Sequence, residues 1–296
     1  MEYTHVERTV PVMKHKLLLT TAIVFILVGV VGMAAYKFKF SDAYPEHNQT
    51  WALQANELKK LSIISDYKMD ISFTTGSSNE GYVKFQGNMH PEVIERLNSL
   101  TLGGSEFSID LTPPNTSEFF SVNFNSPMGK IDVMLPQGSE LDLLDITTYS
   151  ADISLHNASS KNMKISSASG DIKASDLLAN EIKLESMSGN IEGSNLIAGI
   201  HVINRSGNVD LTQTEGDVTI ENLSGNISVG QHGLSSIIAT SISGNIDIAA
   251  DPEFNGLYQA RSLSGSVNTP ISLNESKQKI TADTKSGDID VRLSKK

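Results

Sequence analysis

The sequence predicts an all-β fold: a β-solenoid of about nine coils, each with two short strands, preceded by an N-terminal transmembrane helix and an irregular α+β cap. Three observations lead to this prediction. An uncharged apolar run lies near the N-terminus, a Ser-Gly-Asp/Asn-Ile/Val phrase recurs through the C-terminal two-thirds of the chain, and apolar residues alternate on both sides of each copy. A phrase that returns every 18 to 22 residues is typical of a stack of similar coils.

The N-terminal run, residues 17–36, reads LLLTTAIVFILVGVVGMAAY and has no charged side chain. A helix of this length is about 30 Å long, which matches the hydrocarbon core of a bilayer. We therefore expect an uncleaved single-pass anchor, with residues 1–16 as a cytoplasmic tail and the rest of the chain outside the cell membrane. A cleaved signal peptide is the alternative, because Gly32-Met33-Ala34 resembles a cleavage site, although the run is long for such a peptide.

The segment between the anchor and the repeats gives mixed signals. Residues 37–65 are predicted to form a partly helical linker, on the basis of four apolar residues at roughly helical spacing: Trp51, Leu53, Leu58 and Leu61. Residues 66–127 combine alternating strand patterns with a short amphipathic helix that starts at Pro91. We predict that they form the cap over the first coil.

Residues 128–296 carry the repeats and are predicted to form the solenoid. The nine copies begin at Met128, Ser150, Ser169, Ser188, Ser206, Ser224, Ser243, Ser264 and Ser286. Between the two strands of most copies, Gly is followed by Asn or Asp, and these residue types suit tight turns with positive φ. The predicted turn glycines are Gly170, Gly189, Gly207, Gly225, Gly244, Gly265 and Gly287.

Two sets of residues are expected to point into the stack. Apolar residues stand six and four positions before each Ser equivalent and three after it, and the position five after is mostly apolar, so one face of each strand is apolar, as at Ile191 and Ile227. A small polar residue stands two positions before each Ser, and we expect it to point inward and hydrogen-bond the turn backbone. The first and eighth copies place Val122, Phe124, Tyr258, Ala260 and Val267 in the apolar columns.

Two functional interpretations of the phrase compete with this structural one. Calcium-binding β-rolls carry Asp in short Gly-rich repeats, but the third position of this phrase is more often Asn, which brings no charge to a cation. β-Helix enzymes that act on polysaccharides need acidic or basic residues that converge on one face, whereas Asp152, Asp171 and Asp288 stand in turns. We therefore interpret the phrase as structural.

Composition and motifs favour a binding role over catalysis. The chain has no cysteine, its seven histidines form no HxxxH or HxH pair, and it contains no phosphate-binding or nucleophile-elbow motif. We expect no catalytic residue, no metal and no cofactor. The net charge of −11 argues against a general affinity for nucleic acid.

A single apolar N-terminal run followed by Ser-Gly-Asp/Asn-Ile/Val coils resembles the bacterial "putative adhesin" β-solenoid family, over roughly residues 10–296. The layout is similar to that of a membrane-anchored member from a cell-envelope stress operon. The resemblance implies an extracytoplasmic protein without known catalytic residues. We expect a non-enzymatic accessory to the envelope stress response, or a binder of an envelope protein or wall polymer. A β-helix enzyme that acts on wall polysaccharide is the alternative.

Overall fold

The structure is a computed structural model that describes residues 25–26, 44–114 and 128–294. Of the predicted anchor at residues 17–36, only Phe25 and Ile26 belong to the described part, where both are helical and exposed. The rest of the predicted anchor and the predicted tail at residues 1–16 lie outside it. Among the described residues, no helix is long and apolar enough to cross a membrane.

The described chain consists mainly of β-strands, together with the helix α2 (Pro91–Ser99). The strands are β1 (Glu46–Gln54), β2 (Lys60–Ser65), β3 (Lys68–Thr75), β4 (Glu80–Asn88), β5 (Glu106–Leu111), β6 (Met128–Leu135), β7 (Leu141–Thr148), β8 (Ile153–His156), β9 (Ser160–Ser167), β10 (Ile172–Ser186), β11 (Ile191–Ser206), β12 (Val209–Glu215), β13 (Val218–Ser224), β14 (Ile227–Gln231), β15 (Ile237–Ser243), β16 (Ile246–Ala250), β17 (Leu257–Ser262), β18 (Val267–Asn268), β19 (Lys279–Ser286) and β20 (Ile289–Leu293).

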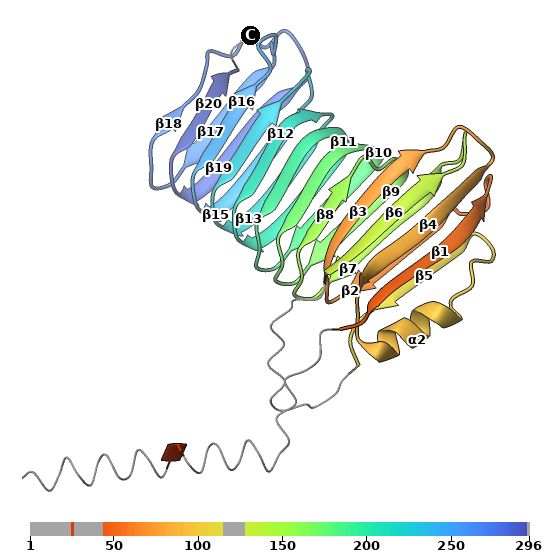
Figure 1. Ribbon diagram of the computed structural model, residues 1–296. Coiled ribbons are helices and arrows are strands. Elements are labelled where there is room, and N and C mark those ends of the chain that lie inside the picture. Colours follow the sequence, from red (N-terminus) through yellow and green to blue (C-terminus); the bar gives the residue numbers. More distant parts are fainter. Residues whose placement is uncertain (1–24, 27–43, 115–127, 295–296) are drawn as a thin grey trace, which may run out of the picture. The chain divides into compact units, whose positions relative to one another are not determined.

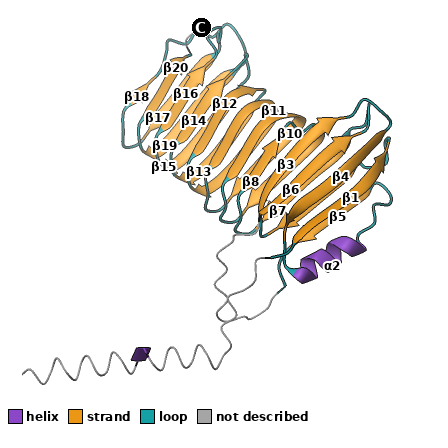
Figure 2. Cartoon of the chain, in the orientation of Figure 1, coloured by secondary structure: helices purple, strands orange, loops and turns teal. Residues whose placement is uncertain are grey.

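Consecutive strands lie on opposite sides of a flattened coil, and the coils stack into a long solenoid (Figures 1 and 2). Neighbouring coils pair in parallel and in register, so equivalent residues of the repeat lie side by side. Ile227, for example, pairs with Val209 in one neighbouring coil and with Ile246 in the other. The predicted β-solenoid with two strands in each coil is confirmed.

The two sides of the coils form two long parallel arrays of strands. One array runs β5–β2–β7–β9–β10–β11–β13–β15–β19–β17. The other runs β6–β3–β8–β10–β11–β12–β14–β16–β20–β18. The long strands β10 and β11 continue around a corner and contribute one half to each array.

The stacking order departs from the chain order at both ends of the solenoid. The coil of β19 and β20, which comes last in the chain, pairs on one side with β15 and β16 and on the other with β17 and β18. The coil of β2 and β3, which comes first in the chain, is likewise inserted between two later coils. One of them consists of β5 and β6, and the other of β7 and β8. Each of these coils is therefore covered on both sides, which buries apolar rows that an end coil would expose.

The coil of β2 and β3 was not expected, and it corrects the prediction of a partly helical linker at residues 37–65. The described part of that segment forms β1 and β2 instead of a helix. Trp51 and Leu53 are both buried and lie two positions apart on β1. This alternation with period two is that of a strand and not of a helix. Asn56, with a φ of 58°, lies in the turn that separates the two strands and interrupts the apparent helical spacing.

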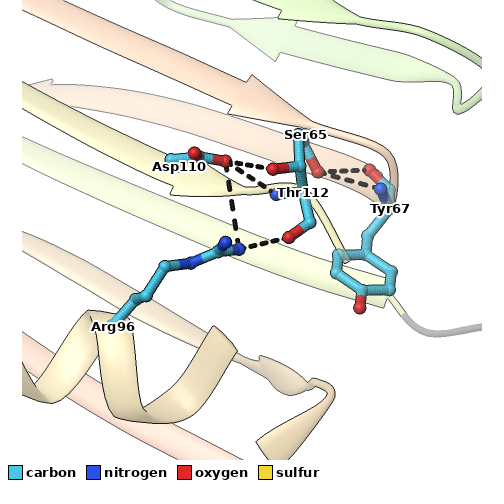
Figure 3. Close-up of polar contacts among 5 residues, drawn as sticks. All are labelled: Ser65, Tyr67, Arg96, Asp110 and Thr112. Atoms are coloured by element: carbon cyan, nitrogen blue, oxygen red, sulfur yellow. Dashed lines mark hydrogen bonds and ion pairs between the residues drawn. The ribbon is translucent and has the colours of Figure 1, made fainter. Parts of the chain in front are cut away.

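The cap does not coincide with the predicted residues 66–127, because β3 and β5 belong to coils and β1 lies before that range; residues 115–127 lie outside the described part of the chain. The cap consists of β1, β4 and the predicted helix, which is α2; β1 and β4 are antiparallel to each other, and β4 is antiparallel to β6. Arg96 on α2 donates a hydrogen bond to the carbonyl of Thr112 at the end of β5, and its guanidinium lies 4.0 Å from Asp110 (Figure 3). This contact fastens the helix to the first coil of the stack.

The predicted inward columns are buried along the described stack, with exceptions in the end coil. Ile191 and Ile227, for example, are at most 1% exposed. In the coil of β17 and β18, however, Tyr258 and Ala260 are half-buried and Val267 is exposed. This coil has a neighbour on one side only, so its apolar row is only partly covered. Val122 and Phe124, which were also expected to point inward, lie outside the described residues.

The predicted polar column also points inward and binds the turns. The buried members are Thr148, Ser167, Ser186, Asn204, Asn222, Ser241 and Thr284. Asn222 Nδ2, for example, donates to the carbonyl of Gly225 in its own coil at 3.0 Å and to that of Gly207 in the next coil at 3.2 Å. Asn204 and Thr284 also donate to turn carbonyls, whereas Thr148 and Ser167 accept backbone N–H groups of their turns. The hydroxyls of Ser186 and Ser241 have no hydrogen-bond partner among the described residues.

Candidate functional site

The repeated phrase builds a continuous ladder of hydrogen bonds, which we name the turn ladder. The side-chain Oδ1 of the residue after each turn Gly accepts the backbone N–H of the equivalent residue in the next coil. In stacking order the ladder joins Asp152, Asp171, Asn190, Asn208, Asn226, Asn245, Asp288 and Ser266, over N···O distances of 2.7 to 3.0 Å. Asn and Asp both supply this oxygen, which explains why either residue occurs at this position of the phrase.

The turn glycines allow the coils to approach each other closely. Gly207, Gly225, Gly244, Gly265 and Gly287 have positive φ values between 120° and 153°. Gly170 and Gly189 do not, but at both of them an added Cβ would lie 1.9 to 2.3 Å from a backbone oxygen of the neighbouring coil. The first five positions need Gly for conformation and for space, and the other two need it for space alone.

Removing one oxygen of the turn ladder should weaken the solenoid modestly. In Asn208→Ala, the N–H of Asn226 loses an acceptor that lies 2.9 Å away. We expect the free energy of unfolding, measured with urea, to fall by about 1 kcal/mol. Asn208→Asp keeps the acceptor and should be close to wild type. A loss in Asn208→Asp as large as that in Asn208→Ala would show that the acceptor oxygen is not what stabilises this turn.

The ladder should also make stability depend on pH at Asp288. The backbone N–H and the hydroxyl of Ser266 both donate to Asp288 Oδ1, at 2.7 and 2.8 Å, and they lower the pKa of this carboxyl. Because the folded-state pKa lies below that of the unfolded chain, the stabilisation is present above about pH 4 and is lost as the pH falls further. Asp288→Asn keeps an acceptor oxygen but does not titrate.

We therefore expect acid to destabilise wild type more than Asp288→Asn, when melting temperatures are compared between neutral pH and pH values near the pKa of the carboxyl. The two proteins differ only in this side chain, so the difference between their melting temperatures reports on this residue. Parallel curves for the two proteins would contradict the assignment.

The outer surface of the array that contains β8, β10, β11 and β12 carries a shallow groove with polar walls, and we name this surface the open face. The groove encloses about 310 Å³. Its polar and charged lining residues are His156, Lys173, Ser175, Glu192, Ser194, Asp210 and Thr212. Strand alternation places these side chains outward in register: Lys173 pairs with Glu192, and Glu192 pairs with Asp210.

The open face brings together a His, a Ser and an Asp. His156 Nδ1 shares a 2.6 Å hydrogen bond with Ser175 Oγ, and His156 Nε2 lies 3.7 Å from Asp70 Oδ1. These are the residue types of a hydrolase triad, but here the Ser meets Nδ1 and the Asp approaches Nε2, the reverse of the usual arrangement. The backbone around Ser175 pairs with β8 and β11 on its two sides. It therefore offers no pair of free N–H groups to stabilise an oxyanion.

The carboxyls with shifted pKa values do not behave as catalytic acids. Burial raises the pKa of Asp132, but hydrogen bonds from Ser72 and Lys130 outweigh it and the net shift is downward. The pKa of Asp142 is lowered by its hydrogen bond with Lys161. A general acid in a glycosidase needs the opposite shift. Nor do any three His, Asp or Glu side chains in the described ranges gather closely enough to hold a metal ion.

Sequence reasoning missed this site for a topological reason. His156 and Ser175 are one coil apart, at a spacing of 19 residues, and their proximity could have been found from the repeat. Asp70 could not, because β3 carries no copy of the phrase and reaches β8 only through the change in stacking order.

Comparisons with known proteins place the repeats in a family. The family described as Toastrack DUF4097 matches residues 58–296. No curated protein matches the chain. Similar solved structures include a "putative adhesin" from Bacteroides fragilis, 14% identical over 85% of this chain and 100% of that chain, with a TM-score of 0.46.

Two others are a "putative cell adhesion protein" from Clostridium sporogenes and a "putative lipid binding protein" from Parabacteroides distasonis. The first is 13% identical over 84% of this chain and 100% of that chain, with a TM-score of 0.27. The second is 15% identical over 82% of this chain and 97% of that chain, with a TM-score of 0.40. At such identities and TM-scores, these names say nothing about what this chain binds.

Proposed function

We propose that this chain, which belongs to the Toastrack DUF4097 family, is a membrane-anchored protein whose solenoid lies outside the cell membrane and binds an envelope protein or wall polymer. Family membership confirms the resemblance that the repeats indicated. The observation that carries the proposal is the open face, a rigid array of parallel strands whose outward side chains stand in regular rows. Solenoids commonly use such extended surfaces to bind partners.

The anchor is supported by the uncharged run at residues 17–36, which is long enough to span a bilayer. The layout also resembles LiaG of the Lia cell-envelope stress operon, and we propose on this basis that the protein is an accessory of the envelope stress response. Protease added to intact protoplasts should then digest the solenoid. Complete protection would contradict this topology, and a soluble form that begins near Tyr36 would indicate cleavage instead.

The open face offers hydrogen-bonding and charged groups in rows about 4.8 Å apart, the spacing of neighbouring strands. Lys173 and Glu192 form a 3.1 Å ion pair at the surface, and such exposed pairs contribute little to stability. They can therefore exchange partners with a ligand at low cost. This property suits binding of an extended polar molecule.

The binding test compares the two arrays of the solenoid. In a membrane crosslinking experiment, Lys173→Ala with Glu192→Ala should lose the captured partner while the melting temperature is unchanged. Thr219→Ala, on the opposite array, is the control and should retain the partner. Equal capture by both proteins would exclude the open face as the binding surface.

An enzyme of wall polysaccharide is the second candidate, because Glu192 and Asp210 are adjacent carboxylates in the groove. Retaining glycosidases use two carboxyl groups about 5 Å apart. The hydrogen bond with Glu192 raises the pKa of Lys173, so a lysine cation lies beside these carboxylates. We expect no hydrolysis of peptidoglycan or teichoic acid, and turnover that is abolished by Asp210→Asn in a folded protein would overturn the binding proposal.

A further inference from the structure

We propose that the solenoid lies with one long edge against the surface of the lipid bilayer. This inference rests on the proposed membrane anchor. The edge is formed by the residue just before the Ser of each phrase, at the turn that joins the two arrays. We name this column the apolar ridge, and in stacking order it consists of Tyr149, Ala168, Met187, Arg205, Leu223, Ile242, Lys285 and Leu263.

The apolar ridge is exposed although most of its members are apolar. Five of its side chains are 42% to 63% exposed: Tyr149, Met187, Leu223, Ile242 and Leu263. Neighbouring coils are about 4.8 Å apart, so the eight members form a straight line about 34 Å long. Exposed apolar side chains that recur along one edge of a stack are characteristic of an interaction site, and a straight edge fits a flat surface.

The charge along the apolar ridge fits a bilayer with anionic lipids. The protein carries a net charge of −11, yet the two charged members of the ridge, Arg205 and Lys285, are both basic. Acidic residues stand two positions before three members of the ridge, at Glu185, Glu221 and Asp283, on the face of the array, and Asp66 lies at the first turn of the ridge. Basic residues near the surface are attracted to anionic headgroups, and Tyr149 has the amphipathic ring that is common at membrane interfaces.

The described segment 44–114 begins at the same edge. Tyr149 donates its backbone N–H to Asp66, which lies in the turn between β2 and β3. The next residue in that turn is Tyr67, whose pKa is raised by burial and by the nearby Tyr44. Tyr44 also contacts the ring of His90 at the start of α2, with centroids 6.0 Å apart. The point where the chain enters the solenoid therefore lies beside the first member of the apolar ridge.

The connection to the predicted anchor is short. Residues 37–43 lie between the apolar run and Tyr44, and seven residues span at most about 25 Å when fully extended. The edge at which the chain enters is thus held near the bilayer, and the apolar ridge continues along that edge. The opposite turns also carry two exposed apolar residues, Leu178 and Ile197, which pair with each other, but this row ends at Glu215 in the next coil and lies away from the entry point.

The absence of cysteine makes a direct test possible. Single cysteines are introduced into the full chain at Leu223 and Ile242 on the ridge, and at Ile197 as the matched exposed apolar control. Each is labelled with an environment-sensitive fluorophore after reconstitution into vesicles of phosphatidylethanolamine and phosphatidylglycerol. We expect the two ridge labels to shift their emission to shorter wavelength and to be quenched by a nitroxide-bearing lipid, whereas the label at Ile197 shows neither effect.

The other outcomes overturn the inference in distinct ways. Ridge labels that behave like the control, in protein that floats with the vesicles after an alkaline wash, would refute the lipid contact and leave the anchor intact. A blue shift without quenching would show that a second copy or another protein covers the ridge. Protein that fails to float would refute the anchor and the lipid contact together.

Discussion

Ile227→Asp is expected to lower the free energy of unfolding by about 4 kcal/mol or more, because it places a carboxyl where no water reaches it. Ile227 is 1% exposed and lies between Val209 and Ile246 of the neighbouring coils. Burial raises the pKa of such a carboxyl above its value in the unfolded chain. The deficit should therefore be smallest below about pH 4 and should grow as the pH rises.

Ser228→Asn is the matched control, since Ser228 is the next residue on β14, points outward by alternation, and an uncharged amide avoids repulsion with Asp210 and Asp247 in the neighbouring coils. It should remain within about 0.5 kcal/mol of wild type, as most surface substitutions do. Urea unfolding of the two variants measures the difference. Equal destabilisation would show that the inward and outward faces of β14 have been assigned wrongly.

The sequence was sufficient to predict the inward columns, because every coil repeats the same local pattern. Ile191, Ile227 and Asn222 each point into the stack as their positions in the phrase require. A parallel stack in register turns one correct local assignment into a correct assignment for all equivalent residues. The role of Asn222 at the turn was predicted for the same reason, since a small polar side chain at that place can reach the turn backbone.

The stacking order could not be predicted, because pairing between coils is not encoded in the spacing of a repeat. Nothing in the local sequence of β19 or β20 distinguishes insertion before the coil of β17 and β18 from addition after it. At the other end, the turn of β2 and β3 reads Ser65-Asp66-Tyr67 and lacks the phrase, so this coil was taken for linker and cap. The helical spacing of apolar residues in β1 and β2 was coincidental.

The candidate site was harder to predict than the fold. Asp70 joins His156 and Ser175 only because of the change in stacking order. The apolar ridge was present in the sequence as Tyr, Met, Leu and Ile before several of the Ser residues. It was overlooked because that position is outward, where an isolated apolar residue has no meaning by itself. Its meaning comes from stacking, which brings Leu223 next to Ile242.

Gly225→Val is expected to cost about 3 kcal/mol or more, because this position combines a conformational and a steric requirement. The φ of Gly225 is 120°, which a β-branched residue rarely adopts, and an added Cβ would lie 2.1 Å from the carbonyl oxygen of Gly207. Relief of that clash would separate two coils and weaken the turn ladder, in which the N–H of Asn226 donates to Asn208 Oδ1 over 2.9 Å.

Gly230→Val is the control, since the nearest atom to its added Cβ is 3.6 Å away and Gly230 does not have a positive φ. We expect it to unfold in urea like wild type. If Gly225→Val also did so, the phrase would have no structural reason for its Gly, and a binding role for the turns would become the better explanation.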